Sequence, residues 1–109
     1  MAGLRLHDRV EIPAAGGGAP TLGTFREAGR PQAVLLVHGI LGHRRLPEID
    51  LLADALAKAR DVLTIDVRGH GEDALRFTWG REEWRQVGDA VGWLRGSATR
   101  VDVIGFSLM

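Results

Sequence analysis

Apolar residues change their spacing along this 109-residue chain, and each spacing predicts a different element. Loose alternation over residues 4–12, and again over residues 21–26, predicts two short strands. The Pro- and Gly-rich segment 13–20 cannot continue a strand, so the two are expected to form an antiparallel hairpin with a long loop. The glycine triplet 16–18 also suits a phosphate-binding loop. However, it lacks the G-x-G-x-x-G spacing and no helix pattern follows it, which favours a plain turn.

The remaining pattern alternates continuous apolar runs with helical periodicity. Runs at residues 33–37, 62–65 and 101–104 are typical of strands covered on both faces in a parallel sheet. Two helices are expected between them, over residues 47–60 and 81–95. Strand, helix, strand, helix, strand with short connections favours right-handed crossovers. The fold class predicted from the pattern is therefore α/β, with an antiparallel entrance to a doubly wound sheet.

Local signals support both helices. Pro47 suits a first helical position, and Gly96 suits the end of the second helix. In that helix one apolar stripe is expected to face the core, made by Trp84, Val87, Val91 and Leu94.

Each buried run is followed by a polar, glycine-containing turn, at residues 38–43, 66–71 and 105–109. Ligands in such sheets bind at the carboxyl ends of the strands, so these turns are where chemistry is expected. The chain here resembles the α/β-hydrolase fold family, which includes esterases, lipases, acyl hydrolases and some serine peptidases. Three motifs carry the resemblance in order: Leu-Leu-Val-His-Gly ending at Gly39, Asp-x-Arg-Gly-His-Gly beginning at Asp66, and Gly-x-Ser ending at Ser107.

The resemblance implies a role for Ser107 as the nucleophile of a strand-to-helix elbow. A serine hydroxyl is a weak nucleophile, so it needs an adjacent base and donors for the oxyanion formed on attack. In the family these donors are backbone N–H groups, which map onto Ile40 and Leu108.

The resemblance also implies loop-shaping roles for His38, Gly39 and Gly105. His38 is a candidate catalytic base, but a histidine at this strand end is more often a brace that holds the loop through hydrogen bonds. Gly105 supplies a small neighbour at the elbow, whereas Met109 stands where the family has a second glycine.

Other polar residues in the turns are expected to be structural. Asp66 is expected to anchor the turn that follows it, and His70 to shape the same turn. His43 and the pair Arg44-Arg45 are expected on an ordinary solvated loop, with a substrate entrance as the alternative.

In the family the triad acid and histidine follow the serine, and only Leu108 and Met109 follow Ser107 here. Residues 1–109 are therefore expected to be the N-terminal part of one α/β-hydrolase domain, inactive without the missing C-terminal half. In the family the strand at 33–37 lies between the other two parallel strands. The strand at 101–104 would then form an open apolar edge.

Composition narrows the partners. Fourteen basic residues balance fourteen acidic ones, so net charge gives no argument for nucleic acid or a membrane surface. The absence of cysteine excludes disulfides and thiolate chemistry, and no histidines show metal-ligand spacing. No cofactor or metal is implied. With no signal-like or membrane-length apolar stretch, a cytoplasmic location is expected. The family resemblance implies a small-molecule acyl substrate.

The function expected from these residues is that of a serine hydrolase acting on carboxylic esters, thioesters or amides through an acyl-enzyme. Two alternatives within the same fold stay open: a non-catalytic binding protein, and an acyltransferase or lyase. A dinucleotide-binding domain is a further alternative, in which Asp66 would bind a ribose, although the glycine spacing after residue 37 does not fit it.

Overall fold

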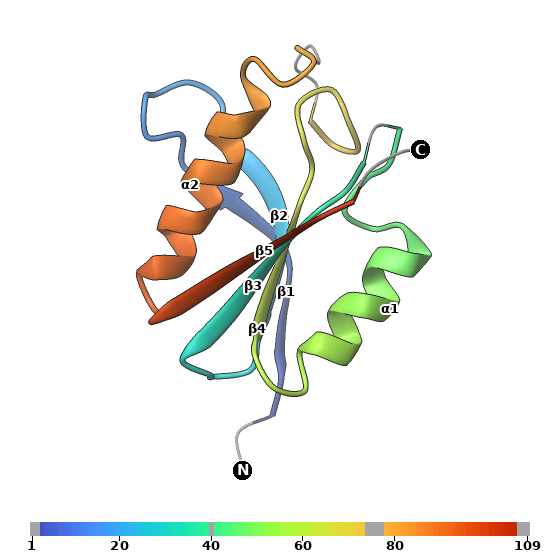
Figure 1. Cartoon of the computed structure of the whole chain (residues 1–109), viewed down its shortest axis with the longest axis vertical. Helices are drawn as coiled ribbons and strands as arrows, with labels where there is room; N and C mark the ends of the chain where they lie inside the picture. The colour runs from blue at the N-terminus through green and yellow to red at the C-terminus, as the bar shows by residue number, and fades with distance from the viewer. Residues whose placement is uncertain (1–2, 40, 74–77, 107–109) are drawn as a thin grey trace.

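A computed structural model describes residues 3–39, 41–73 and 78–106 of the chain. Within these residues the chain forms five strands and two helices (Figure 1). Their order along the chain is β1 (Arg5–Ile12), β2 (Thr21–Glu27), β3 (Gln32–Val37), α1 (Pro47–Leu56), β4 (Asp61–Ile65), α2 (Glu83–Arg95) and β5 (Arg100–Gly105).

All five described strands belong to one sheet, in the order β1-β2-β4-β3-β5. β1 and β2 form the predicted antiparallel hairpin, and β2 also pairs antiparallel with β4. β3 pairs parallel with β4 on one side and with β5 on the other. The expected α/β class and the expected position of β3 between the other two parallel strands are both confirmed. In a dinucleotide-binding sheet the third parallel strand would lie beyond the second, but antiparallel β2 occupies that place here, which contradicts this alternative.

The two helices cover opposite faces of the sheet (Figure 1). Successive side chains of β3 point to opposite faces, so both faces need apolar residues and the run reads as continuous. On one face Leu35 and Leu63 pack with Leu94 of α2. On the other face Val34 and Val62 pack with residues of α1. Full burial of one such side chain stabilises the fold by about 1.5–3 kcal/mol.

The helix boundaries differ from the prediction at one end each. Pro47 is the first residue of α1 and Gly96 caps α2, as predicted. However, α1 ends at Leu56 rather than near residue 60, and residues 57–59 form a turn. α2 begins at Glu83 rather than 81, because the chain before it turns at Trp79 and Gly80, both with positive φ.

The apolar stripe predicted for α2 is wrong at Trp84, whose side chain is 64% exposed. The buried residues of this helix are Glu83, Gln86, Ala90 and Leu94. Because Glu83 and Gln86 accept or donate hydrogen bonds inside the fold, they occupy the inner face and rotate Trp84 toward solvent.

β5 is an edge strand of the described sheet, as the resemblance implied. Val103 and Ile104 are 48% and 36% exposed, so the prediction of a strand covered on both faces does not hold at β5. The run is apolar, but only one neighbour, β3, lies beside it in the described residues.

Candidate active site

The carboxyl ends of β3, β4 and β5 meet at one edge of the sheet. Val37, the last residue of β3, pairs with Ile65 of β4 and with Gly105 of β5. One residue further, the backbone N–H of Phe106 donates to the carbonyl of Val37 at 2.9 Å. The chain therefore leaves β5 beside the start of the loop that follows β3.

The proposed nucleophile and both proposed oxyanion donors, Ser107, Leu108 and Ile40, lie outside the described residues, as does Met109. Their neighbours in the chain are described on both sides of position 40 and up to position 106. The described part of the site consists of these flanking residues and the side chains that hold them.

His38 joins two of the strand-end loops. Its Nδ1 lies 2.7 Å from the carbonyl of Gly39, and its Nε2 lies 2.9 Å from the backbone nitrogen of Val67. A carbonyl only accepts, so Nδ1 carries the proton and Nε2 accepts from the Val67 N–H. The ring is 6% exposed and lies 5.1 Å from the ring of His70. With both nitrogens engaged in these bonds, the geometry suits a brace rather than a base.

Burial also favours the neutral form of this histidine. It lowers the pKa of the His38 imidazole below the ordinary 6.5, and the nearby His70 ring lowers the pKa further. The hydrogen bond to Gly39 acts in the opposite direction but does not outweigh burial.

Glycines shape the loop after β3. The N–H of Gly42 donates to the carbonyl of Gly39 at 3.0 Å and closes a tight turn. Gly42 is buried, and a Cβ there would lie 3.0 Å from a methyl of Leu46 and 3.1 Å from that carbonyl. Leu41 within the turn has a positive φ of 67°. Gly105 differs, since no described atom lies within 4 Å of where its Cβ would be.

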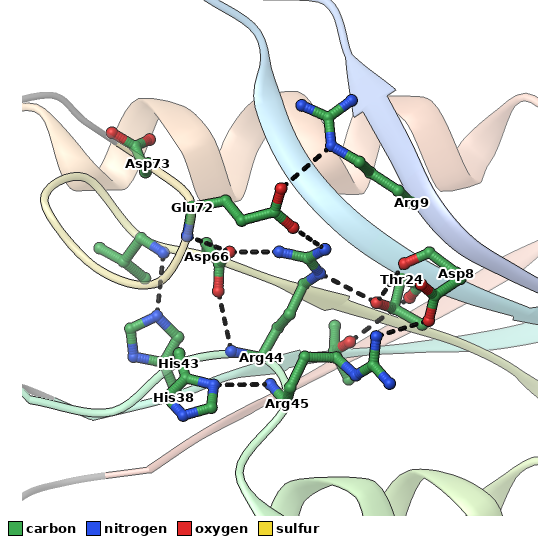
Figure 2. A network of polar contacts seen from close by, with 12 residues as sticks. Asp8, Arg9, Thr24, His38, His43, Arg44, Arg45, Asp66, Glu72 and Asp73 are labelled. Atoms are coloured by element: carbon green, nitrogen blue, oxygen red, sulfur yellow. Dashed lines mark hydrogen bonds and ion pairs between the residues drawn. The ribbon is translucent and has the colours of Figure 1, made fainter.

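Arg44 is buried, which corrects the expectation of a solvated Arg44-Arg45 pair. Its guanidinium donates to Asp66 Oδ2, to Glu72 Oε1 at 2.5 Å and, from Nε, to Thr24 Oγ1 at 2.9 Å (Figure 2). Its backbone N–H donates to Asp66 Oδ1 at 2.9 Å. Arg45 is exposed as expected and pairs with Asp8 at the rim of the network.

Asp66 is the centre of this network, and its expected anchoring role is confirmed. Both of its oxygens accept from Arg44, and Oδ2 also accepts from the backbone N–H of Glu72 at 2.9 Å. Gly71 has a positive φ of 56°, and a Cβ there would overlap the Asp66 carboxylate. The glycine therefore lets the loop after β4 wrap closely around that carboxylate.

Glu72 lies at the outer side of this network and is held by two arginines. The hydrogen bond from Arg44, and then the one from Arg9, hold the pKa of the Glu72 carboxyl below its ordinary 4.5. Figure 2 shows Glu72 between these two guanidinium groups. Glu72 is therefore the ionised link between Arg9 on β1 and Arg44 in the loop after β3.

Gln86 of α2 also holds the loop after β4, a role that the sequence pattern did not reveal. The amide oxygen of Gln86 accepts from the N–H of Arg68 at 2.7 Å, and its nitrogen donates to Thr21 and Asp73. A glutamine on a helix gives no periodic signal for such a role, because its partners come from distant segments.

The described residues also contain a cleft, but neither a cluster of metal ligands nor a membrane-spanning helix. No three His, Cys, Asp or Glu side chains in the described parts of the chain gather to hold a metal ion. A cleft of about 540 Å³ lies between the Gly-rich loop and α2, and its lining includes Trp84 and, from the loop after β4, Arg68. No helix within residues 3–39, 41–73 and 78–106 has the length and apolar character needed to cross a bilayer.

Comparisons with known proteins agree with this fold. A solved esterase, Pf2001 from Pyrococcus furiosus, superposes with a TM-score of 0.80 at 27% identity over 90% of this chain and 40% of that chain. Ethanol acetyltransferase 1 from Kluyveromyces lactis is 36% identical over an alignment of 81 residues, and the match covers 72% of this chain and 21% of that protein. The bottromycin epimerase BotH superposes with a TM-score of 0.67 at 32% identity over 91% of this chain and 39% of that one.

The chain thus spans about two fifths of the esterase and about one fifth of the acetyltransferase. The model of the alpha/beta hydrolase family matches residues 34–108, which include most of β3, all of β4 and β5, and the segments that follow these strands. This chain is therefore a member of the alpha/beta hydrolase family.

Proposed function

We propose that this chain is the N-terminal part of a serine enzyme that attacks carboxylic esters, thioesters or amides. The observation that carries the proposal is the hydrogen bond from the Phe106 N–H to the Val37 carbonyl. It supports a nucleophile at position 107 that emerges beside the loop holding position 40.

In the proposed reaction the Ser107 hydroxyl oxygen bonds to the substrate carbonyl carbon and its proton passes to a base. That base is a histidine from the remainder of the domain, in the order that the family uses. The carbonyl oxygen becomes an oxyanion, which the N–H groups of Ile40 and Leu108 stabilise. The leaving group departs with the proton, and an acyl-serine remains. Water or an alcohol then takes the acyl group and restores the serine hydroxyl.

The acceptor distinguishes a hydrolase from an acyltransferase. Similarity to an esterase supports water as the acceptor, whereas the higher identity to an ethanol acetyltransferase supports an alcohol. Incubation of the whole domain with p-nitrophenyl acetate and ethanol separates the two. Acetate as the main product supports hydrolysis, and ethyl acetate as the main product supports transfer.

Fluorophosphonate labelling tests the nucleophile. We expect the probe to label the whole domain at Ser107, and not the Ser107→Ala variant. We also expect residues 1–109 alone to stay unlabelled, because no triad histidine follows the serine within them. A folded whole domain that resists labelling would contradict the proposal and favour a binding protein of the same fold.

A further inference from the structure

The loop after β3 is fixed from outside by a buried ionic clamp. Arg44 lies four residues after position 40, and its side chain is 3% exposed. It reaches three other segments: Thr24 on β2, Asp66 at the end of β4 and Glu72 in the loop after β4. Each hydrogen-bonding nitrogen of the guanidinium therefore has its own acceptor.

Stability alone gives a poor reason for this arrangement. Removing two charges from water is costly, and apolar replacements of buried ion pairs are often neutral or stabilising. Asp66 is 1% exposed and Arg44 is 3% exposed, so both lose most of their hydration. What the pair supplies is a fixed geometry, because a guanidinium and a carboxylate fit together in few orientations.

Two features show that the fold is arranged around this pair. Asp66 accepts from the main chain of Arg44 as well as from its guanidinium, so both the backbone and the side chain of the loop are held. Gly71 leaves room for the carboxylate that any side chain would fill. On the other side of position 40, His38 ties the start of the loop to Val67.

We propose that Arg44 is a positioning residue that holds residues 38–39 and 41–46 of the loop after β3, the loop that carries the proposed oxyanion donor. This assignment rests on the proposed function. Arg44 would not touch the substrate, and it would act through Asp66 and the loop backbone. Its loss should therefore lower the rate of the chemical step while leaving substrate binding unchanged.

The test uses the whole domain, a p-nitrophenyl ester and two arginines that are adjacent in the sequence. Arg44→Lys keeps the positive charge but removes the planar guanidinium and its set of directed donors. We expect kcat to fall about 10-fold or more, with KM within about twofold of the wild-type value. Arg45→Lys is the matched control, since Arg45 is 47% exposed and pairs with Asp8, and its kinetics should not change. Amide hydrogen exchange across residues 38–46 should rise in Arg44→Lys and not in Arg45→Lys.

A second variant keeps the test decisive if Arg44→Lys folds poorly. Glu72→Gln weakens the outer contact at a half-exposed carboxylate, and we expect kcat to fall about threefold with KM unchanged. Wild-type kcat in the folded variants overturns the assignment, and so does a loss confined to KM or an unchanged exchange rate. Failure of the proposed function looks different, because the wild-type domain itself would then lack labelling at Ser107.

Discussion

The imidazole of His38 accepts a hydrogen bond from the backbone N–H of Val67, with 2.9 Å between the two nitrogens. The same ring donates to the Gly39 carbonyl from its other nitrogen. One neutral side chain thus connects the loop after β3 to the loop after β4. A proton on Nε2 would place two N–H groups against each other and break the connection.

We therefore predict a stability loss in mild acid that depends on His38. Burial holds the folded pKa of His38 below the ordinary 6.5, so near and below that pH the unfolded chain binds more protons. The contribution is complete above pH 6.5 and is lost as the pH falls through the folded pKa. Urea unfolding between about pH 7 and about pH 5 measures this slope.

His38→Gln should flatten the slope, because glutamine can accept from Val67 but does not titrate. His7→Gln is the matched control, since His7 lies on β1 and pairs with Glu27 rather than with either loop. Parallel pH profiles for the wild type and His38→Gln would refute the prediction.

Gly71→Ala should be strongly destabilising because two penalties combine. The backbone has a positive φ of 56°, and the new Cβ would overlap the Asp66 carboxylate. We expect a loss of about 3 kcal/mol or more in the free energy of unfolding. Gly17→Ala is the control, since φ is 85° there and no described atom lies within 4 Å of where the Cβ would be, and it should lose only about 1–2 kcal/mol. Equal losses at the two positions would exclude a role for the close approach to Asp66.

Glu83→Gln should loosen the turn before α2. The Glu83 carboxylate accepts from the N–H and hydroxyl of Thr78, at 3.0 Å and 2.5 Å, and from the N–H of Gly80. Loss of the charge should lower the free energy of unfolding by about 1–3 kcal/mol. The neighbouring Glu82→Gln, at a more exposed carboxylate, is the control and should change it by less than about 0.5 kcal/mol.

The Glu83 effect should also depend on pH. Burial raises the pKa of this carboxyl, but the hydrogen bonds from Thr78 and Gly80 and the charge of Arg68 outweigh burial, so the pKa lies below the ordinary 4.5. The stabilisation is complete above pH 4.5 and is lost as the pH falls through the folded pKa. Wild type and Glu83→Gln should therefore converge in acid, and a constant difference in thermal unfolding across this range would contradict the assignment.

The exposed apolar edge at β5 should make residues 1–109 associate with themselves. Among the described strands only β3 pairs with β5, so the outer side of β5, with its exposed Val103, forms a template for another strand. Val103→Lys should shift the sedimentation profile toward the monomer. Leu51→Lys is the control, because Leu51 is 72% exposed on α1 and not at the sheet edge. If both variants shift the profile equally, association does not run through the edge.

The sequence made the elements and their order predictable to within a few residues. Apolar runs at β3 and β4 are continuous because both faces of these strands are covered, and such runs can be recognised from the sequence alone. The three strand-end turns could also be recognised from the sequence, because glycine and polar residues interrupt each apolar run. The edge position of β5 came from the family resemblance, because an apolar run looks the same whether one neighbour or two pair with it.

The clamp around Arg44 was not predictable from the sequence. Two adjacent arginines in a loop are predicted to be exposed to solvent, and no local sequence feature indicates that Arg44 is buried while Arg45 is not. Its acceptors Asp66 and Glu72 lie 22 and 28 residues away in the sequence. Trp84 was misplaced for a related reason, because its hydrophobicity predicted burial while the interior needed the hydrogen bonds of Glu83 and Gln86.

The sequence by itself thus determined the class of fold, the hairpin, the crossover order and the positions where chemistry is expected. These follow from local spacing, because the periodicity of apolar residues reflects which faces of an element are covered. Only the tertiary structure decided which charges are buried and which loops they connect. Ion pairs and side-chain hydrogen bonds depend on distances between segments far apart in the chain, and these distances are set only when the sheet is assembled.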